Sequence, residues 1–241
     1  MFEKTLNYCH GRFDENLSTM QKKLIHLRHY AVLLIAAVIT NCAAQGQHTH
    51  RYNLAKMLKN NMLDTSFAVG TKAIQSMQQK NAITTTKVVW LKGVSFNKGT
   101  IDVDLRGKDV FLNSFLGIAF HGIDSLTYDA VYFRPFNFKH LDTLRRKWSV
   151  QYFRLPEFDY DKLRKEHPLT YENAVSPVPD PSNWFHATIV VDGAWVTVYV
   201  DNSPAPCLKA PLLTNRKGSL IGLWDAGLSG DFANLVIRGS Q

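Results

Sequence analysis

From residue 87 onward, apolar and polar side chains alternate with a period of two, and this pattern constrains the chain to β-structure. Residues 100–107 show it most clearly. The apolar side chains there share one face and the charged ones share the other: Ile101, Val103 and Leu105 against Asp102, Asp104 and Arg106. Such alternation is typical of a half-buried strand in an antiparallel sheet.

The same alternation recurs in short segments separated by turn residues. Further strands are predicted over residues 115–121, 128–138, 148–155, 184–192, 195–201, 219–224 and 231–237. Gly193 and Ala194 separate two of them and predict a tight hairpin. Prolines make 167–183 a loop, and only 160–165 favours a helix. The pattern predicts an all-β fold, a sandwich or a jelly roll.

The N-terminal 45 residues have the composition of a targeting segment. Lys22 and Lys23 precede an apolar run at 31–39, and small residues follow it, as in a secretory signal. Met20 is a candidate for the true start. Cleavage after Ala44 predicts a free exported protein, whereas lipidation of Cys42 predicts a lipoprotein, and a buried apolar helix is the third alternative.

This interpretation divides the chain into three parts. Residues 1–45 form a signal or targeting segment, 46–60 a polar tether, and 61–241 the jelly-roll domain. No Asn-x-Ser/Thr acceptor follows residue 45, which favours the periplasm or bacterial cell envelope over a eukaryotic secretory route. A lipid on Cys42 is the one membrane attachment that the sequence predicts.

Composition excludes several classes of protein. The three cysteines rule out a dense disulfide scaffold, and no apolar run reaches about 18 residues, the length of a spanning helix. The formal charge of +8 is spread along the chain without a nucleic-acid-binding motif or a basic stripe. Nucleic acid is therefore not an expected partner.

Several segments together carry a resemblance to a known family. They are residues 183–193, 195–202, 222–224, 230–235 and 96–104. The first two read as paired strands, with an aromatic, a histidine, alternating aliphatics and a turn. This arrangement resembles concanavalin A-like lectin/glucanase and laminin-G-like domains, most of all the bacterial 3-keto-disaccharide hydrolase-like branch. The resemblance covers roughly residues 85–240.

The resemblance implies a two-sheet antiparallel jelly-roll sandwich with a curved sheet whose concave face meets carbohydrate. It does not supply a catalytic pair. Laminarinase-type members carry Glu-x-Asp-x-Glu on one strand, a spacing that does not occur here. The spacing of Asp102 and Asp104 permits a carboxylate pair, although a solvated strand face is the favoured explanation for them. The resemblance also implies a structural calcium at Asp231, an expectation weakened by Ala233; no other cofactor is expected.

Polar residues on two predicted strands supply the chemistry of a sugar-binding site. Tyr132 and Arg134 share one face of their strand. Aromatic rings stack on sugar C–H groups, and planar polar groups bind paired hydroxyls. The candidate substrate-binding residues are Tyr132, Asn137, Gln151, Tyr152 and Arg154. The structural alternative is that Arg134 anchors a loop carboxylate and the tyrosines complete the core.

A catalytic hypothesis uses His121, Arg134 and Glu157. His121 is a candidate general base, Glu157 (or Asp159) the acid, and Arg134 the group that stabilises an oxyanion. A 3-keto sugar has an acidic proton beside its ketone, so these groups suit a keto-glycoside hydrolase or lyase. An enzyme requires them to converge in one pocket. The alternatives are a non-catalytic glycan-binding or adhesion module and a scaffold without a small ligand.

Overall fold

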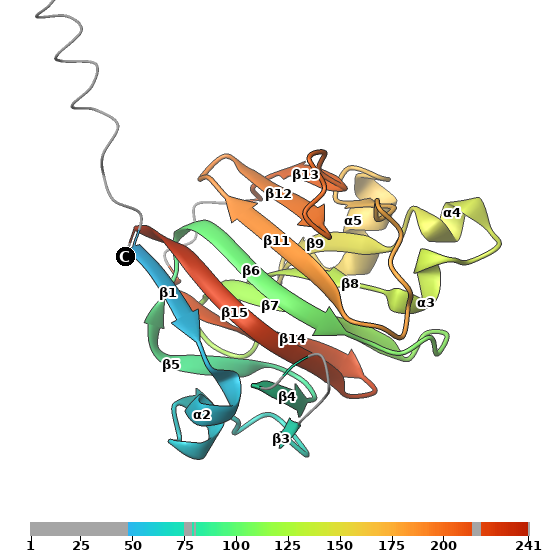
Figure 1. The fold of residues 1–241 in the computed structure, drawn as a ribbon. Helices are drawn as coiled ribbons and strands as arrows, with labels where there is room; N and C mark the ends of the chain where they lie inside the picture. Colours follow the sequence, from blue (N-terminus) through green and yellow to red (C-terminus); the bar gives the residue numbers. More distant parts are fainter. Residues whose placement is uncertain (1–47, 75–78, 80, 214–217, 241) are drawn as a thin grey trace, which may run out of the picture. The chain divides into compact units, whose positions relative to one another are not determined.

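Two antiparallel sheets pack face to face in this protein, as the alternating pattern predicts (Figure 1). The structure is a computed structural model that describes residues 48–74, 79, 81–213 and 218–240. The predicted signal segment, with Met20 and Cys42, lies outside the described residues. Every pair of neighbouring strands in both sheets is antiparallel.

The first sheet has eight strands and carries the chain's longest strand. In spatial order it contains β13 (Leu208–Pro211), β12 (Trp195–Val200), β11 (Phe185–Val191), β6 (Lys98–Arg106), β15 (Gly230–Ser240), β4 (Ala82–Thr85) and β3 (Lys72–Ile74), with β1 (His48–Tyr52) also paired to β15.

The second sheet has seven strands. Their order is β10 (Glu172–Asn173), β9 (Val150–Arg154), β8 (Asp129–Phe133), β7 (Ser114–Gly122), β14 (Leu220–Gly227), β5 (Val89–Ser95) and β2 (Leu63–Asp64). Short helices occupy the connections: α2 (Leu54–Lys59), α3 (Pro135–Phe138), α4 (Thr143–Arg146) and α5 (Tyr160–Glu166). None of the helices in the described residues is long and apolar enough to cross a membrane.

The core lies between the sheets and is built from the inward side chains of both. Ile101 and Phe232 of the eight-stranded sheet and Leu116 and Phe133 of the seven-stranded sheet are fully buried in one cluster. Phe133 packs edge-to-face on Phe185 across the two sheets. Burying apolar surface on both inner faces is what holds the layers together.

Two sequence predictions need correction. Residues 48–60, predicted as part of a polar tether, form β1 and α2. β1 completes the backbone pairing of the β15 edge, and Leu54 is fully buried in the core. The strand predicted over 128–138 ends at Phe133, because Pro135 lacks an N–H for the ladder and starts α3 instead.

We expect Phe133→Ala to lower the free energy of unfolding by about 3–5 kcal/mol, because it leaves a cavity between the sheets. Phe67→Ala is the matched control: its ring is 52% exposed, so the loss should stay within about 0.5 kcal/mol. Urea denaturation followed by circular dichroism measures both. Equal losses in the two variants would contradict the packing described here.

Candidate functional site

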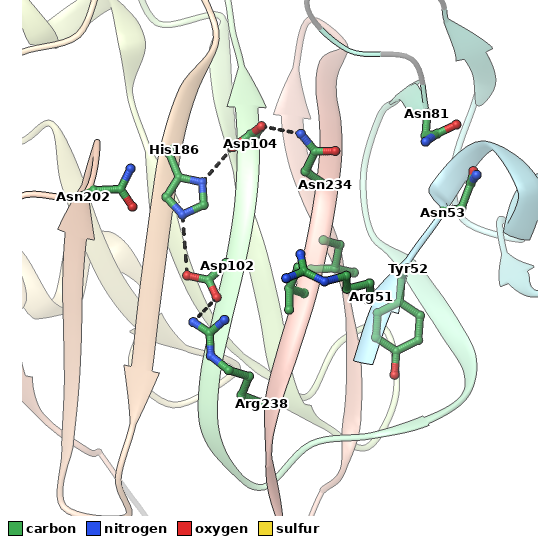
Figure 2. Close-up of a pocket in the computed structure, with 12 residues that line it drawn as sticks. Arg51, Tyr52, Asn53, Asn81, Asp102, Asp104, His186, Asn202, Asn234 and Arg238 are labelled. Atoms are coloured by element: carbon green, nitrogen blue, oxygen red, sulfur yellow. Dashed lines mark hydrogen bonds and ion pairs between the residues drawn. The ribbon is translucent and has the colours of Figure 1, made fainter. Parts of the chain in front are cut away.

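A polar depression of about 650 Å³ lies on the outer face of the eight-stranded sheet, the face turned away from the seven-stranded sheet (Figure 2). The pairing of β6 with β11 and with β15 determines its composition. Asp104 lies directly opposite His186 on one side and Ala233 on the other. Since paired residues share a face, the polar side chains of three strands gather there.

His186 lies between two carboxylates of β6. Its Nδ1 is 2.7 Å from Asp104 Oδ1, and its Nε2 is 3.5 Å from Asp102 Oδ1. The Thr188 hydroxyl donates to Asp102 Oδ1 at 2.7 Å, and the Arg238 guanidinium pairs with Asp102 Oδ2. Figure 2 shows His186 joined to both carboxylates, and Asp102 joined in turn to Arg238.

This arrangement fixes the charges of the three central groups. Hydrogen bonds to Asp102 and then Asp104 raise the pKa of His186 to about 9. Burial opposes ionisation of the two carboxyls, but the hydrogen bonds from His186 and its neighbours outweigh burial and hold both pKa values below the ordinary range. At neutral pH the centre therefore contains an imidazolium between two carboxylates.

A bulge in β15 brings an amide into the same group. The register of β15 on β6 shifts between Ala233 and Val236, and Asn234 has a positive φ of 51°. Asparagine tolerates this left-handed conformation better than most residues. The turned side chain donates to Asp104 Oδ2 at 2.7 Å and to Gln79 Oε1 at 2.6 Å. Both carboxylate oxygens of Asp104 therefore have a hydrogen-bond partner, Oδ1 in His186 and Oδ2 in Asn234.

The rim of the depression carries groups that remain free for a ligand. The side chain of Arg51 in β1 is exposed and forms no hydrogen bond or ion pair within the described residues. The amides of Asn81 and Asn202 also line the depression, as does Asn53, whose Oδ1 already accepts from Lys56 N at the start of α2. In Figure 2, Tyr52 points away from His186. The depression is therefore suited to hydrogen bonding more than to ring stacking.

Three of the residues predicted as a site do come together, on the outer face of the seven-stranded sheet. The Tyr132 hydroxyl donates to Gln151 Oε1 at 2.8 Å, and the Arg134 guanidinium contacts both groups. Arg134 also donates to the Trp148 carbonyl and lies 3.7 Å from Glu172. All of these side chains except that of Trp148 are buried. The Glu172 carboxylate, which lies in β10, accepts its hydrogen bonds from Arg164.

His121 belongs to a different group, on the inner side of the same sheet. Its Nδ1 is 3.1 Å from Asp129 Oδ2, and its Nε2 is 2.6 Å from the Asn97 carbonyl oxygen. The Tyr152 hydroxyl donates to the same Asp129 oxygen at 3.1 Å. Arg154 lies 4.0 Å from Asp129 and 3.3 Å from Glu157. Strand alternation places Asp129 and Tyr152 on the face opposite Tyr132.

The predicted catalytic group is therefore divided. His121 and Arg134 lie on opposite faces of the seven-stranded sheet, in two separate hydrogen-bonded groups. Glu157 is exposed and lies 3.3 Å from Arg154, whose side chain lies 4.0 Å from Asp129 of the His121 group. Asn137 is buried and donates to the Trp148 carbonyl at 3.2 Å, beside Arg134. The one pocket that the catalytic hypothesis requires is not formed by these contacts.

Asp231, the residue considered for calcium, does not fit a metal. Its Oδ2 accepts from Arg106 Nε at 2.8 Å and lies 2.7 Å from Nη2 of the same side chain. A guanidinium in that position repels a cation. Among the described residues, moreover, no group of three histidine, cysteine or acidic side chains is arranged to hold a metal ion.

Sequence reasoning missed His186 and treated Asp102 and Asp104 chiefly as a solvated face. The signal was present in part, because His186 and Thr188 alternate on one face of their strand as the two aspartates do on theirs. These two strands are about eighty residues apart, and their pairing leaves no local pattern in the sequence. The same is true of the bulge that turns Asn234 toward Asp104.

No family model matches the chain, and no curated protein matches it. Similar folds occur among solved structures. A carbohydrate-binding module, CBM66 of Bacillus subtilis, is 13% identical with a TM-score of 0.46, covering 73% of this chain and 95% of its own. The exoplasmic/lumenal domain of VIP36, bound to Ca²⁺ and Man3GlcNAc, is 12% identical with a TM-score of 0.49, covering 82% and 90%.

A third similar structure is the β-glucanase of Bacillus licheniformis, 12% identical with a TM-score of 0.45 and coverage of 70% of this chain and 82% of its own. Similarity at this level concerns the β-sandwich architecture.

We expect the His186 imidazole to titrate near pH 9 in NMR spectra. Asp104→Asn should move this pKa down toward the ordinary value of about 6.5, whereas Asp161→Asn on exposed α5 should leave it unchanged.

The same ion pairs make the free energy of unfolding depend on pH. Because the pKa of His186 is raised in the folded state, its contribution to stability is complete below about pH 6.5 and is lost as pH rises through about 9. A His186→Gln variant should therefore lack this part of the decline in unfolding free energy. Titration of His186 at its ordinary value in the unsubstituted protein would contradict the ion-pair geometry.

Proposed function

We propose that this protein binds carbohydrate in the depression on the outer face of the eight-stranded sheet. The observation that carries the proposal is the lining of that depression. Carboxylate, imidazolium, guanidinium and amide groups from several strands meet in a hollow of about 650 Å³. The sequence resemblance to concanavalin A-like lectins and glucanases predicts the same class of ligand.

The chemistry of the lining suits sugar hydroxyls. Adjacent hydroxyls on a sugar ring form paired donors and acceptors, which planar side-chain groups bind two at a time. Arg51 and Asn202 offer such groups from either side of His186. Because the central side chains are held by one another, little conformational entropy is lost when a ligand binds them.

The residues of the depression favour carbohydrate binding without catalysis. A glycosidase needs one protonated carboxylic acid and one carboxylate. Asp102 and Asp104 both have lowered pKa values and both bind His186, so neither is a proton donor at neutral pH. Burial raises the pKa of Asp225 to about 8, but that side chain is only 3% exposed and faces the core, opposite Leu116.

This proposal replaces the keto-glycoside hydrolase or lyase as the leading hypothesis and retains the glycan-binding module. Export to a bacterial cell envelope, with or without a lipid on Cys42, remains part of the proposal. An exported module of this kind would meet glycans outside the cytoplasm.

A glycan array probed with the full chain should reveal binding that Arg51→Ala weakens by about tenfold to a hundredfold, since one bidentate charged contact contributes about 1.5–3 kcal/mol. Lys209→Ala is the matched control, because it removes one cation from the same face of the sheet outside the depression. Calorimetry with the best glycan measures both variants. Binding that is lost equally in the two variants, or that Arg51→Ala leaves unchanged, would place the ligand elsewhere.

Turnover assays on 3-keto and unmodified glycosides should give no product. Product formation that both His121→Ala and Arg134→Ala abolish, in variants whose thermal unfolding shows an intact fold, would overturn the binding proposal in favour of catalysis. As a control for contaminating enzyme, activity should co-elute with the chain through two purification steps.

A further inference from the structure

Three connections at one end of the sandwich carry exposed apolar side chains. They are the β6–β7 loop, the β8–β9 connection with α3 and α4, and the β14–β15 turn. The exposed large apolar residues there are Val110, Phe111, Leu112, Leu141, Leu144 and Leu228. We call this set the apolar tips. Leu141 is 95% exposed and Leu112 61%, so neither contributes its full side chain to the core.

The apolar tips lie on connections that contact one another. Phe111 packs edge-to-face on Phe136, with ring centroids 5.7 Å apart, and lies 6.0 Å from the His140 ring. Leu228 N donates to the Asn113 carbonyl at 2.7 Å. The first two connections also enclose a hollow of about 280 Å³ lined in part by Phe136, His140 and Leu141. An apolar surface built from separate connections is a feature that marks interaction sites.

Basic side chains accompany the apolar tips. Besides the buried Arg134, five cations lie on the same connections: Lys108, Lys139, Arg145, Arg146 and Lys147. The Arg145 guanidinium lies 4.8 Å from the centroid of the Phe111 ring, which places charge directly beside an apolar tip. Asp142 and Asp180 partly offset these charges through Arg145 and Lys139, and Asp109 is the remaining carboxylate. The net charge of the side chains at this end of the sandwich is therefore positive.

We propose that this end of the sandwich docks on the surface of an anionic lipid bilayer. Phe, Leu and Val at loop tips can enter the boundary between headgroups and acyl chains, while Lys and Arg meet the anionic headgroups. A second copy of this chain is disfavoured, because a two-fold contact would bring the Arg145–Lys147 cations toward their own counterparts. The inference is independent of glycan binding, since the depression is formed by other residues on the outer face of the eight-stranded sheet.

Flotation of the full chain with vesicles tests the proposal. Vesicles of phosphatidylcholine with one quarter phosphatidylglycerol should bind the chain more strongly than phosphatidylcholine alone. Phe111→Ser with Leu141→Ser should lower partitioning roughly tenfold or more, because two apolar insertions are removed. Lys147→Gln should lower it roughly fivefold on the anionic vesicles. Leu126→Ser is the matched control: this residue is 75% exposed in the β7–β8 connection, at the opposite end, and should not change partitioning.

Hydrogen exchange of the vesicle-bound full chain distinguishes this surface from attachment through residues 1–45. Peptides covering 108–113 and 139–147 should gain protection, and a peptide covering 123–127 should not. Three results would overturn the proposal: no preference for anionic vesicles, equal partitioning of the double variant and the control, or protection confined to the first 45 residues. Concentration-dependent dimers that the double variant abolishes would assign the surface to a second copy instead.

Discussion

The central position of β6 is the constraint on which the rest of the structure depends. This strand pairs with β11 on one edge and with β15 on the other, and so joins segments from the middle and the end of the chain. Its inward side chains, Ile101, Val103 and Leu105, are fully buried. Its outward side chains must then share a surface with those of both neighbours. The hydrophobic packing that fixes the register of β6 thereby also positions Asp102 and Asp104 beside His186.

The polar groups of this protein divide into two kinds, and burial distinguishes them. Tyr132, Arg134 and Gln151 form a closed group in which desolvation raises the pKa of Tyr132 to about 12. Such a group must satisfy its own hydrogen bonds, because water does not reach it. His186 and Arg238 remain partly exposed, with 26% and 36% of their side chains accessible. They can therefore exchange water for the hydroxyl groups of a ligand.

The sandwich architecture separates the two proposed surfaces. Strand faces present side chains at fixed spacing, which suits a ligand with several hydroxyl groups in a defined arrangement. Connections at the strand ends are free of the ladder, so Phe111 and Leu141 can protrude without leaving backbone groups of a strand unpaired. A chain that binds glycan on a sheet face can thus attach to a lipid surface through one end.

The sequence by itself determined the main strands after residue 87, the Gly193 hairpin and the face of each side chain in those strands, because a period of two is a local property. The short strands β1 to β4, β10 and β13 were not predicted. It also determined that Tyr132 and Arg134 act together, since they are two residues apart. It did not determine that β6 lies between β11 and β15, nor that Asn234 turns toward Asp104 from 130 residues away. Which strands pair is decided by burial of the whole core, and a bulge depends on the register of both partners. For that reason the closed group around Arg134 was visible as a candidate site, and only the tertiary structure brought His186 between its two carboxylates.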